Sequence, residues 1–146
     1  MQLVIGCDHA GLELKQQLLT HLSESGHSVE DLGTYDGASI DYPDYAERVA
    51  RAVADGDAQL GLLVCGSGQG MCMAANKIHG VRAAVCSDTF SAHAVREHND
   101  ANVLCLGQRV VGVGLAQEIV DTFLKAEFEG GRHSRRVGKI MALEGR

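Results

Sequence analysis

A glycine-rich loop that begins with a cysteine, Cys65-Gly66-Ser67-Gly68-Gln69-Gly70, has the residue types of an anion-binding turn. Three glycines at alternate positions, between an apolar run and a helical pattern, let backbone amides turn toward one anion, and the dipole of the following helix adds to the attraction. A thiolate is stabilised near a helix N-terminus. A thiolate at Cys65 could take a proton from carbon while the neighbouring amides hold the enediolate oxygen that results. Simple packing of the thiol in the core is the competing interpretation.

Three other ligand-binding loops match this stretch less well. No Lys-Ser/Thr pair follows the glycines, which argues against a P-loop. The spacing is Gly-x-Gly-x-Gly and the loop follows the third expected strand, so a dinucleotide site is disfavoured, although Asp88 lies about twenty residues on, where a ribose-binding acid would stand. A cysteine phosphatase needs Cys-x5-Arg, and the arginine position is Met71.

A second candidate site lies near the C-terminus, in Gly130-Gly131-Arg132-His133-Ser134-Arg135-Arg136. In a helix that begins near residue 132, Arg132 and Arg136 are four positions apart and share a face. Two guanidinium groups on one face suit a dianionic phosphate. The alternative is a solvated basic helix end, and we assign Arg135 and Lys139 to it.

His98 supplies an imidazole that could shuttle a proton near neutral pH. The helix expected at 90–97 runs back from the sheet edge that carries Cys65, so His98 should lie roughly 10–12 Å below that edge at ~1.5 Å per residue. Within one subunit His98 could hardly reach Cys65. We therefore predict a homodimer in which each subunit supplies its His98 to the active site of the other, with the pairing of dimers into tetramers left open.

The elements that must position these residues alternate between short apolar runs and amphipathic stretches. Strands are expected at 3–5, 60–65, 81–86 and 103–106, with a weaker one at 27–32. Helices are expected at 12–22, 45–54, 71–77, 90–97, 115–128 and from about 132. Continuous apolar runs are typical of buried parallel strands. The pattern predicts an α/β fold, a Rossmann-like three-layer α/β/α sandwich around a five-stranded parallel sheet in the order 2-1-3-4-5.

In such sheets, ligands bind beyond the carboxyl ends of the strands, at the point where the strand order reverses. Residues that follow the strands should therefore converge on one edge and form one active site. They are Asp8 and His9 after the first strand, Cys65 after the third, Ser87 and Asp88 after the fourth, and Gln108 and Arg109 after the fifth.

The composition fits one globular domain over residues 1–146. No stretch approaches the ~20 apolar residues of a membrane helix. Five cysteines without a Cys-x-x-Cys pair fit neither a disulfide framework nor a zinc site, and predict a cytoplasmic location. The net charge is −6, but residues 132–146 hold five basic residues against one acid. A nucleic-acid binder would be basic overall, so this segment indicates a local anion site.

Five motifs in order along the chain resemble the ribose-5-phosphate isomerase B family, which also contains galactose-6-phosphate and allose-6-phosphate isomerases. They begin with Gly6-Cys7-Asp8-His9-Ala10-Gly11 and Asp41-Tyr42-Pro43-Asp44-Tyr45-Ala46. They continue at 65–77, at 96–112 and at 130–136. The resemblance implies a Rossmann-type sandwich, dimeric or larger, whose active sites are shared between subunits. It implies a small sugar phosphate as substrate, no cofactor and no metal.

The resemblance also implies a role for each site residue. Cys65 would move the proton between carbons 1 and 2, and His98 would assist opening of the furanose ring, together with Asp8. Ser67 and the amides of Gly66, Gly68, Gln69 and Gly70 would stabilise the enediolate. The substrate would also be bound by His9, Arg132 and Arg136 at the phosphate, by Asn99 and Arg109 from the partner subunit, and by Tyr42 lining the pocket.

One branch of this family lacks the cysteine and uses a glutamate just after the glycine loop. Met71 stands there in this chain and cannot accept a proton, so the chain resembles the cysteine branch; the run Met71-Cys72-Met73 has no functional explanation. The expected reaction interconverts ribose 5-phosphate and ribulose 5-phosphate by general acid–base catalysis through a cis-enediolate. A six-carbon sugar phosphate isomerase and a non-catalytic sugar-phosphate binding module are the alternatives.

Overall fold

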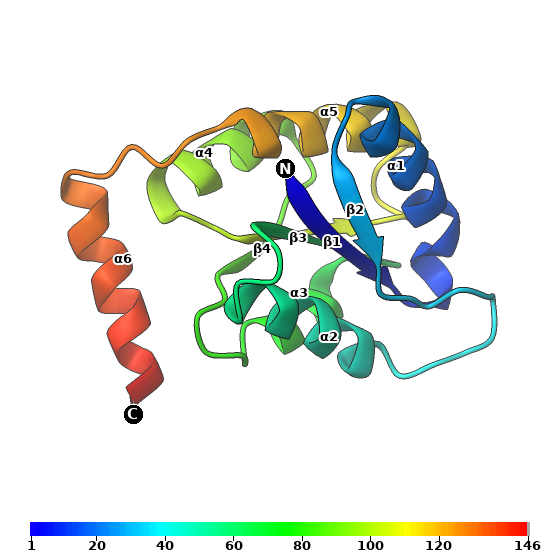
Figure 1. Ribbon diagram of the computed structural model, residues 1–146, viewed down its shortest axis with the longest axis horizontal. Coiled ribbons are helices and arrows are strands. Elements are labelled where there is room, and N and C mark those ends of the chain that lie inside the picture. Colours follow the sequence, from blue (N-terminus) through cyan, green and yellow to red (C-terminus); the bar gives the residue numbers. More distant parts are fainter. Residues whose placement is uncertain (146) are drawn as a thin grey trace.

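The computed structural model describes residues 1–145 and has a five-stranded parallel sheet between two layers of helices (Figure 1). This architecture confirms the α/β sandwich expected from the sequence. In the described residues no helix has the length and apolar character needed to cross a membrane. The strands are β1 (Gln2–Cys7), β2 (Ser28–Asp31), β3 (Leu60–Cys65), β4 (Ala83–Val85) and β5 (Val103–Gly107). The helices are α1 (Leu12–Glu24), α2 (Tyr42–Ala54), α3 (Gln69–Ala75), α4 (Thr89–Asn99), α5 (Val113–Lys125) and α6 (Arg132–Ala142), with short 3-10 turns η1 (His9–Gly11) and η2 (Leu143–Gly145).

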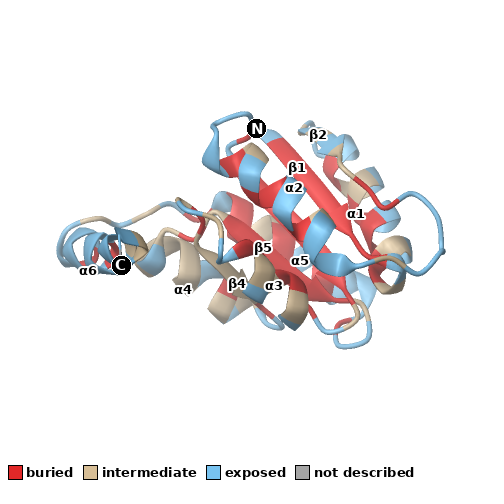
Figure 2. Ribbon diagram, turned by 90° about the horizontal axis from the view of Figure 1, so that it is seen from below, coloured by how far each residue is buried: buried red, intermediate tan, exposed pale blue. Residues whose placement is uncertain are grey.

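The sheet is buried on both faces, which explains why its strands are continuous apolar runs. Successive residues of β1 alternate between the two layers: Leu3 and Ile5 pack with α1, α4 and α5, whereas Val4 packs with α2 and α3. Helix α6 differs from the others because it stands away from the sandwich and is exposed over most of its surface (Figures 1 and 2). Only His133 and Val137 of α6 are buried.

The observed strand order is β2-β1-β3-β5-β4, so the predicted order 2-1-3-4-5 was wrong at its last two positions. All of β5 is buried, and it pairs with β3 in the middle of the sheet. β4 has three residues, all partly exposed, and lies at the edge. A short, half-exposed strand is typical of an edge, where one side has no partner. The order still reverses between β1 and β3, so the expected ligand-binding edge is unchanged.

Gly11 of η1 packs directly against the backbone of β3, and we expect its replacement to destabilise the fold. A Cβ built at Gly11 would lie 2.3 Å from the carbonyl oxygen of Val64, and backbone cannot move aside as a side chain can. Gly11→Ala should lower the free energy of unfolding by about 1–3 kcal/mol or more. Gly37→Ala is the matched control, because a Cβ there has no neighbour within 4 Å. Urea unfolding of both variants measures the difference, and equal midpoints would contradict this packing.

Candidate active site

A cavity of about 490 Å³ opens beyond the carboxyl ends of β1 and β3, where the strand order reverses. Its volume falls within the ~300–1,000 Å³ range of small-molecule sites. The lining residues come from the segments that follow β1, β3 and β5 and from the start of α2. They are Asp8, His9, Ala10, Tyr42, Cys65, Gly66, Ser67, Gly70, Arg109 and Val110.

Cys65 is the last residue of β3, and its side chain lies at the head of the glycine loop. The backbone N–H of Gly68 donates a hydrogen bond to its Sγ over 3.1 Å, and the residue is only 5% exposed. Gly68 has φ +81°, a left-handed conformation that a side chain would strain, and it caps α3. The loop therefore turns around the sulfur of Cys65. Within the loop, the hydroxyl oxygen of Ser67 accepts a hydrogen bond from the N–H of Gln69 at 3.3 Å.

The loop is held from two sides by close packing on glycines. A Cβ at Gly107 would lie 2.7 Å from the carbonyl carbon of Ser67, so the end of β5 lies directly against the loop. A Cβ at Gly70 would lie 2.6 Å from the ring of Tyr42, which fixes that ring over the start of α3. These contacts explain how Tyr42, at the first position of α2, reaches a pocket built mainly by strand ends.

Asp8 follows β1 and is held rigidly at the pocket wall. Its Oδ1 accepts hydrogen bonds from the N–H groups of Ala10 at 2.9 Å and Gly11 at 3.0 Å, and the residue is 7% exposed. The same turn places the exposed His9 at the pocket mouth. Asp8, with its fixed orientation, and the accessible imidazole of His9 can therefore form hydrogen bonds to a polar ligand that enters the pocket from solvent.

Arg109 lies in this pocket with Cys65 of its own chain, which corrects the expectation that it reaches the site from a partner subunit. Its N–H donates to the carbonyl of Gly66 at 3.0 Å, so the segment after β5 is bonded to the glycine loop. Because β5 pairs directly with β3, residue 109 cannot be far from residue 66. The predicted strand order had placed the segment after β5 one strand further from the glycine loop.

Two other residues expected at this edge have structural roles. Asp88 caps α4 by accepting a hydrogen bond from the N–H of Ser91 at 2.7 Å, and this bond lowers the pKa of its carboxyl group. It follows the edge strand β4 and, like Ser87, does not line the pocket. Gln108 accepts a hydrogen bond from the N–H of Leu14 at 3.0 Å and so anchors the start of α1. Ala10 and Val110 also line the pocket and were not predicted; their only signal in the sequence is their position beside His9 and Arg109 within the motifs.

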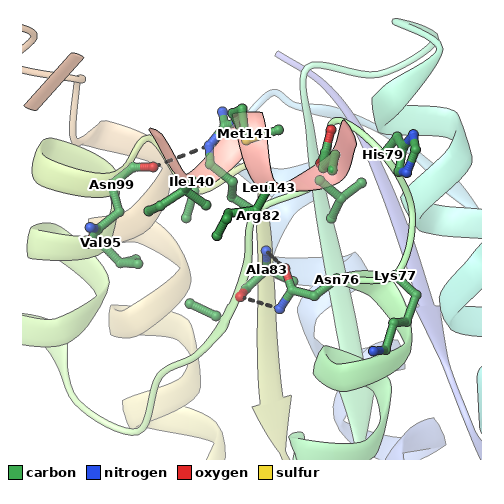
Figure 3. A pocket seen from close by; sticks show the side chains of 14 residues that line it. Asn76, Lys77, His79, Arg82, Ala83, Val95, Asn99, Ile140, Met141 and Leu143 are labelled. Carbon is green, nitrogen blue, oxygen red and sulfur yellow. Dashed lines mark hydrogen bonds between the residues drawn. The ribbon is translucent and has the colours of Figure 1, made fainter. Parts of the chain in front are cut away.

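Six predicted site residues do not line the pocket of this chain: Gly68 and Gln69 belong to the glycine loop itself, and the other four lie elsewhere. His98 and Asn99 end α4, and Arg132 and Arg136 belong to the first turns of α6. In Figure 1, α6 lies at the left of the molecule, whereas β1 points toward the opposite end. Asn99 lines a separate cavity of about 700 Å³ between α6 and the edge strand (Figure 3). This separation matches the expectation that His98 cannot reach Cys65 within one subunit.

Three of the four other cysteines, Cys7, Cys86 and Cys105, are buried and pack in the core. Burial raises the pKa of Cys7 and of Cys86 to about 11. The thiol of Cys105 donates a hydrogen bond to Cys72, which raises the pKa of Cys105 and lowers that of Cys72 to about 7. Met71 is fully buried in the core, while Met73 is 65% exposed. Cys72 is thus a half-buried, acidic thiol outside the pocket lining.

Comparison with known proteins gives close matches over nearly the whole chain. Residues 3–140 match the family model described as Ribose/Galactose Isomerase. Ribose-5-phosphate isomerase B of Escherichia coli is 51% identical, over 99% of this chain and 97% of its own. The structure of ribose-5-phosphate isomerase B from Clostridium thermocellum superposes with a TM-score of 0.98 at 52% identity, covering 99% of this chain and 98% of that one.

A further crystal structure, that of ribose-5-phosphate isomerase B from Mycoplasma genitalium, contains bound ribulose-5-phosphate. It has a TM-score of 0.94 and 48% identity to this chain, covering 99% of this chain and 97% of its own. Matches of this extent include every segment that builds the pocket, from the turn after β1 to the segment after β5. The chain belongs to the ribose/galactose isomerase family.

Proposed function

We propose that this protein interconverts ribose 5-phosphate and ribulose 5-phosphate without a cofactor. The observation that carries the proposal is the placement of the Cys65 thiol, the glycine loop and the Asp8–His9 turn around one cavity of sugar-phosphate size. The proposed substrate comes from two relatives that share about half of their residues with this chain and are named as ribose-5-phosphate isomerases. We also propose that residues 1–146 act as one domain and that the reaction takes place in the cytoplasm, within the pentose phosphate pathway.

Cys65 is the proposed base. As the thiolate it removes the proton on carbon 2 of the open-chain aldose, and the electron pair forms a double bond between carbons 1 and 2 while oxygen 1 becomes negative. A proton then moves from oxygen 2 to oxygen 1. The Cys65 thiol returns its proton to carbon 1, and the ketone forms at carbon 2. The reaction needs no oxidant or reductant, because Cys65 removes the proton from carbon 2 and returns it to carbon 1.

The glycine loop is the proposed oxyanion site. Donors aimed at a developing negative oxygen accelerate such reactions strongly, because they are in place before the charge forms. The N–H of Gly68 is already bonded to the Cys65 sulfur, so it positions the base. The N–H of Gln69 is bonded to the Ser67 hydroxyl oxygen and orients it. The Ser67 O–H and the amides of Gly66 and Gly70 remain to hold the enediolate. Asp8 and Tyr42 complete the wall around the sugar.

The residues expected to open the ring and to bind the phosphate include four that lie outside the pocket of their own chain: His98, Asn99, Arg132 and Arg136. We propose a homodimer in which His98 of the partner subunit donates a proton to the ring oxygen as its bond to carbon 1 breaks, while Asp8 accepts the proton of the hydroxyl on carbon 1. His9 and Arg109 would meet the phosphate from one side, and Asn99, Arg132 and Arg136 of the partner subunit from the other. The exposed apolar residues Ile140 and Leu143, 47% and 55% accessible, give α6 and η2 a surface that a second copy would cover.

Arg136→Ala should weaken substrate binding much more than it slows turnover. A guanidinium bonded to a phosphate contributes about 1.5–3 kcal/mol, which corresponds to a rise in KM of roughly 10–100-fold. Arg135→Ala is the matched control, because Arg135 is also exposed on α6 and is expected to contact no ligand. Steady-state kinetics with ribose 5-phosphate measure both. Equal changes in KM for the two variants would argue against a specific phosphate contact.

Six-carbon sugar phosphates are the alternative substrates, and a binding module without turnover is the alternative function. When two substrates differ by one carbon unit, a pocket usually separates their kcat/KM values by only ~10–200-fold. Values of kcat/KM for ribose 5-phosphate, allose 6-phosphate and galactose 6-phosphate, measured side by side, rank the substrates. A higher value for either six-carbon sugar would replace the proposed substrate, and tight binding of all three without turnover would support the binding module.

A further inference from the structure

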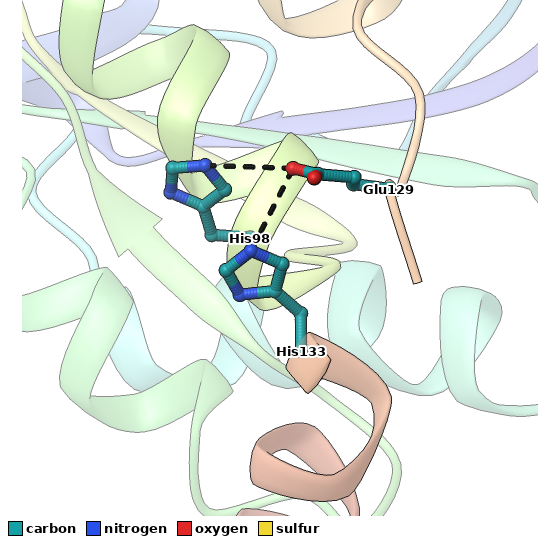
Figure 4. Close-up of side chains that lie close together, drawn as sticks. All are labelled: His98, Glu129 and His133. Atoms are coloured by element: carbon teal, nitrogen blue, oxygen red, sulfur yellow. Dashed lines mark ion pairs between the residues drawn. The ribbon is translucent and has the colours of Figure 1, made fainter. Parts of the chain in front are cut away.

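Three side chains with metal-binding chemistry converge on one point outside the pocket (Figure 4). His98 ends α4, Glu129 lies in the segment between α5 and α6, and His133 belongs to the first turn of α6. One ligand atom of each lies within 4.8 Å of the others. Glu129 Oε2 is 3.6 Å from His133 Nε2 and 3.9 Å from His98 Nε2. We refer to these residues as the α4–α6 cluster.

His133 is the fixed member of the cluster and has an unsatisfied nitrogen. The residue is 6% exposed, and among residues 1–145 its Nε2 has no hydrogen-bond partner. A buried polar atom without a partner costs about 1–3 kcal/mol. Glu129 Oε2, 3.6 Å away, is too distant for a hydrogen bond, yet the unpartnered nitrogen points toward it (Figure 4). A ligand between the nitrogen and the carboxylate would satisfy both.

We propose that the α4–α6 cluster binds a divalent transition-metal ion such as Zn²⁺. Imidazole nitrogen and carboxylate oxygen are typical zinc ligands at about 2.0–2.2 Å, and two histidines with one carboxylate leave a fourth position for water. Ligand atoms around such an ion lie roughly 3.3–3.6 Å apart in tetrahedral geometry. The two measured separations from Glu129 need to shrink by only a few tenths of an ångström. Both carboxylate and imidazole bind this class of ion more strongly than they bind Mg²⁺ or Ca²⁺.

One ring must turn for this coordination, and the mobile one is His98. The rings of His98 and His133 are stacked, with centroids 4.5 Å apart and planes 15° apart, whereas a shared ion needs both ring planes to point at it. The side chains of His98 and Glu129 are 44% and 55% exposed, so they can adjust around the buried His133. The backbone is already in place, because the N–H of Glu129 donates to the carbonyl of Glu97 at 2.9 Å.

Glu97 is the available fourth ligand. Its Oε2 lies 3.6 Å from His98 Nε2 and 3.0 Å from His93 Nε2. A carboxylate that already contacts one histidine can orient a second ligand or coordinate the ion itself. Two carboxylates beside the two imidazoles also offset the charge of a dication.

The consequence for activity rests on the proposed function. His98 is the group assigned to ring opening, and an ion on its Nε2 prevents it from exchanging a proton. Metal binding at the α4–α6 cluster should therefore inhibit isomerisation reversibly. The isomerisation itself needs no metal, so the ion acts as an inhibitor.

Binding is tested first with Co²⁺, because its visible absorption reports the ligand type independently of turnover. The background is Cys65→Ala, which removes the pocket thiol as a competing metal ligand. We expect one Co²⁺ per chain with a spectrum free of thiolate charge-transfer bands. Glu129→Gln and His133→Gln should each weaken this binding at least about tenfold, as loss of a ligand does. His79→Gln, at an exposed histidine outside the cluster, should leave it unchanged.

Unchanged Co²⁺ affinity in Glu129→Gln would overturn the site, and so would the absence of binding in the parent protein. Glu129 is largely exposed, so its amide variant should fold even if the His133 variant does not. Activity is then measured with Zn²⁺ and restored with EDTA. We expect inhibition of the otherwise wild-type enzyme and at least tenfold resistance in Glu129→Gln. Binding without inhibition would leave the metal site in place and overturn the inhibitory role and the assignment of His98 to ring opening.

Discussion

Replacement of Cys65 by alanine is expected to lower kcat for ribose 5-phosphate by about 10²–10⁴-fold, the usual contribution of a general base. The reason is that the thiol is the proposed proton acceptor in the pocket and that alanine leaves no acceptor at the same point. The loop should keep its shape, because the segment after β5 is bonded to Cys65 and Gly66 through backbone atoms. Affinity for ribose 5-phosphate, measured by calorimetry, should change by no more than a few fold.

Cys72→Ala is the control for this experiment. Cys72 has the lowered pKa, about 7, and would be the natural candidate if acidity alone selected the base. It does not line the pocket, so its replacement should leave kcat within about twofold, as expected for a site that does not touch the substrate. A large loss in Cys72→Ala together with near-normal turnover in Cys65→Ala would show that the wrong thiol had been assigned.

Mixed dimers of Cys65→Ala and His98→Asn subunits should recover activity that neither variant has alone. In the proposed homodimer each active site takes its base from one subunit and His98 of the partner subunit. A mixed dimer therefore has one site with both defects and one site with neither. If subunits pair at random, half of the dimers are mixed and the mixture should reach about one quarter of wild-type activity.

The mixture is made by unfolding and refolding the two variants together, and each variant refolded alone is the control. His98 has a 44% exposed side chain, so asparagine at this position should not disturb folding. Activity near one quarter requires that sites be shared. If the mixture stays as inactive as its components while mixed dimers are detected by mass, the shared site is wrong and His98 must act elsewhere.

The sequence predicted the elements well because buried parallel strands and amphipathic helices leave strong local patterns. The five expected strands overlap β1 to β5, and the expected glycine loop joins β3 to α3. Helix α2 begins at Tyr42, three residues before the expected start, because Pro43 lies in its first turn, where the missing N–H is not needed.

Strand order could not be predicted in the same way, because it depends on contacts between segments far apart in the chain. The runs at 81–86 and 103–106 both look apolar and were expected as equivalent buried strands; Arg82 and two alanines in the first run are the signal that could have marked it as the edge strand. The exchange of these two strands leaves Asp88 after the edge strand, away from the pocket, and places Arg109, which follows β5, directly beside the glycine loop. The α4–α6 cluster was invisible for the same reason: His98 lies far from Glu129 and His133 in sequence, and only the packing of α6 beside α4 joins them.

The central claim is that the protein converts ribose 5-phosphate into ribulose 5-phosphate at the pocket between β1 and β3. The most direct test is to incubate the purified full chain with ribose 5-phosphate, in the presence of EDTA, and to follow the ketose by proton NMR. We predict that ribulose 5-phosphate accumulates to the same final ratio from either sugar, and that Cys65→Ala forms almost none. Binding of ribose 5-phosphate without any ketose would contradict the claim and would leave a sugar-phosphate binding module.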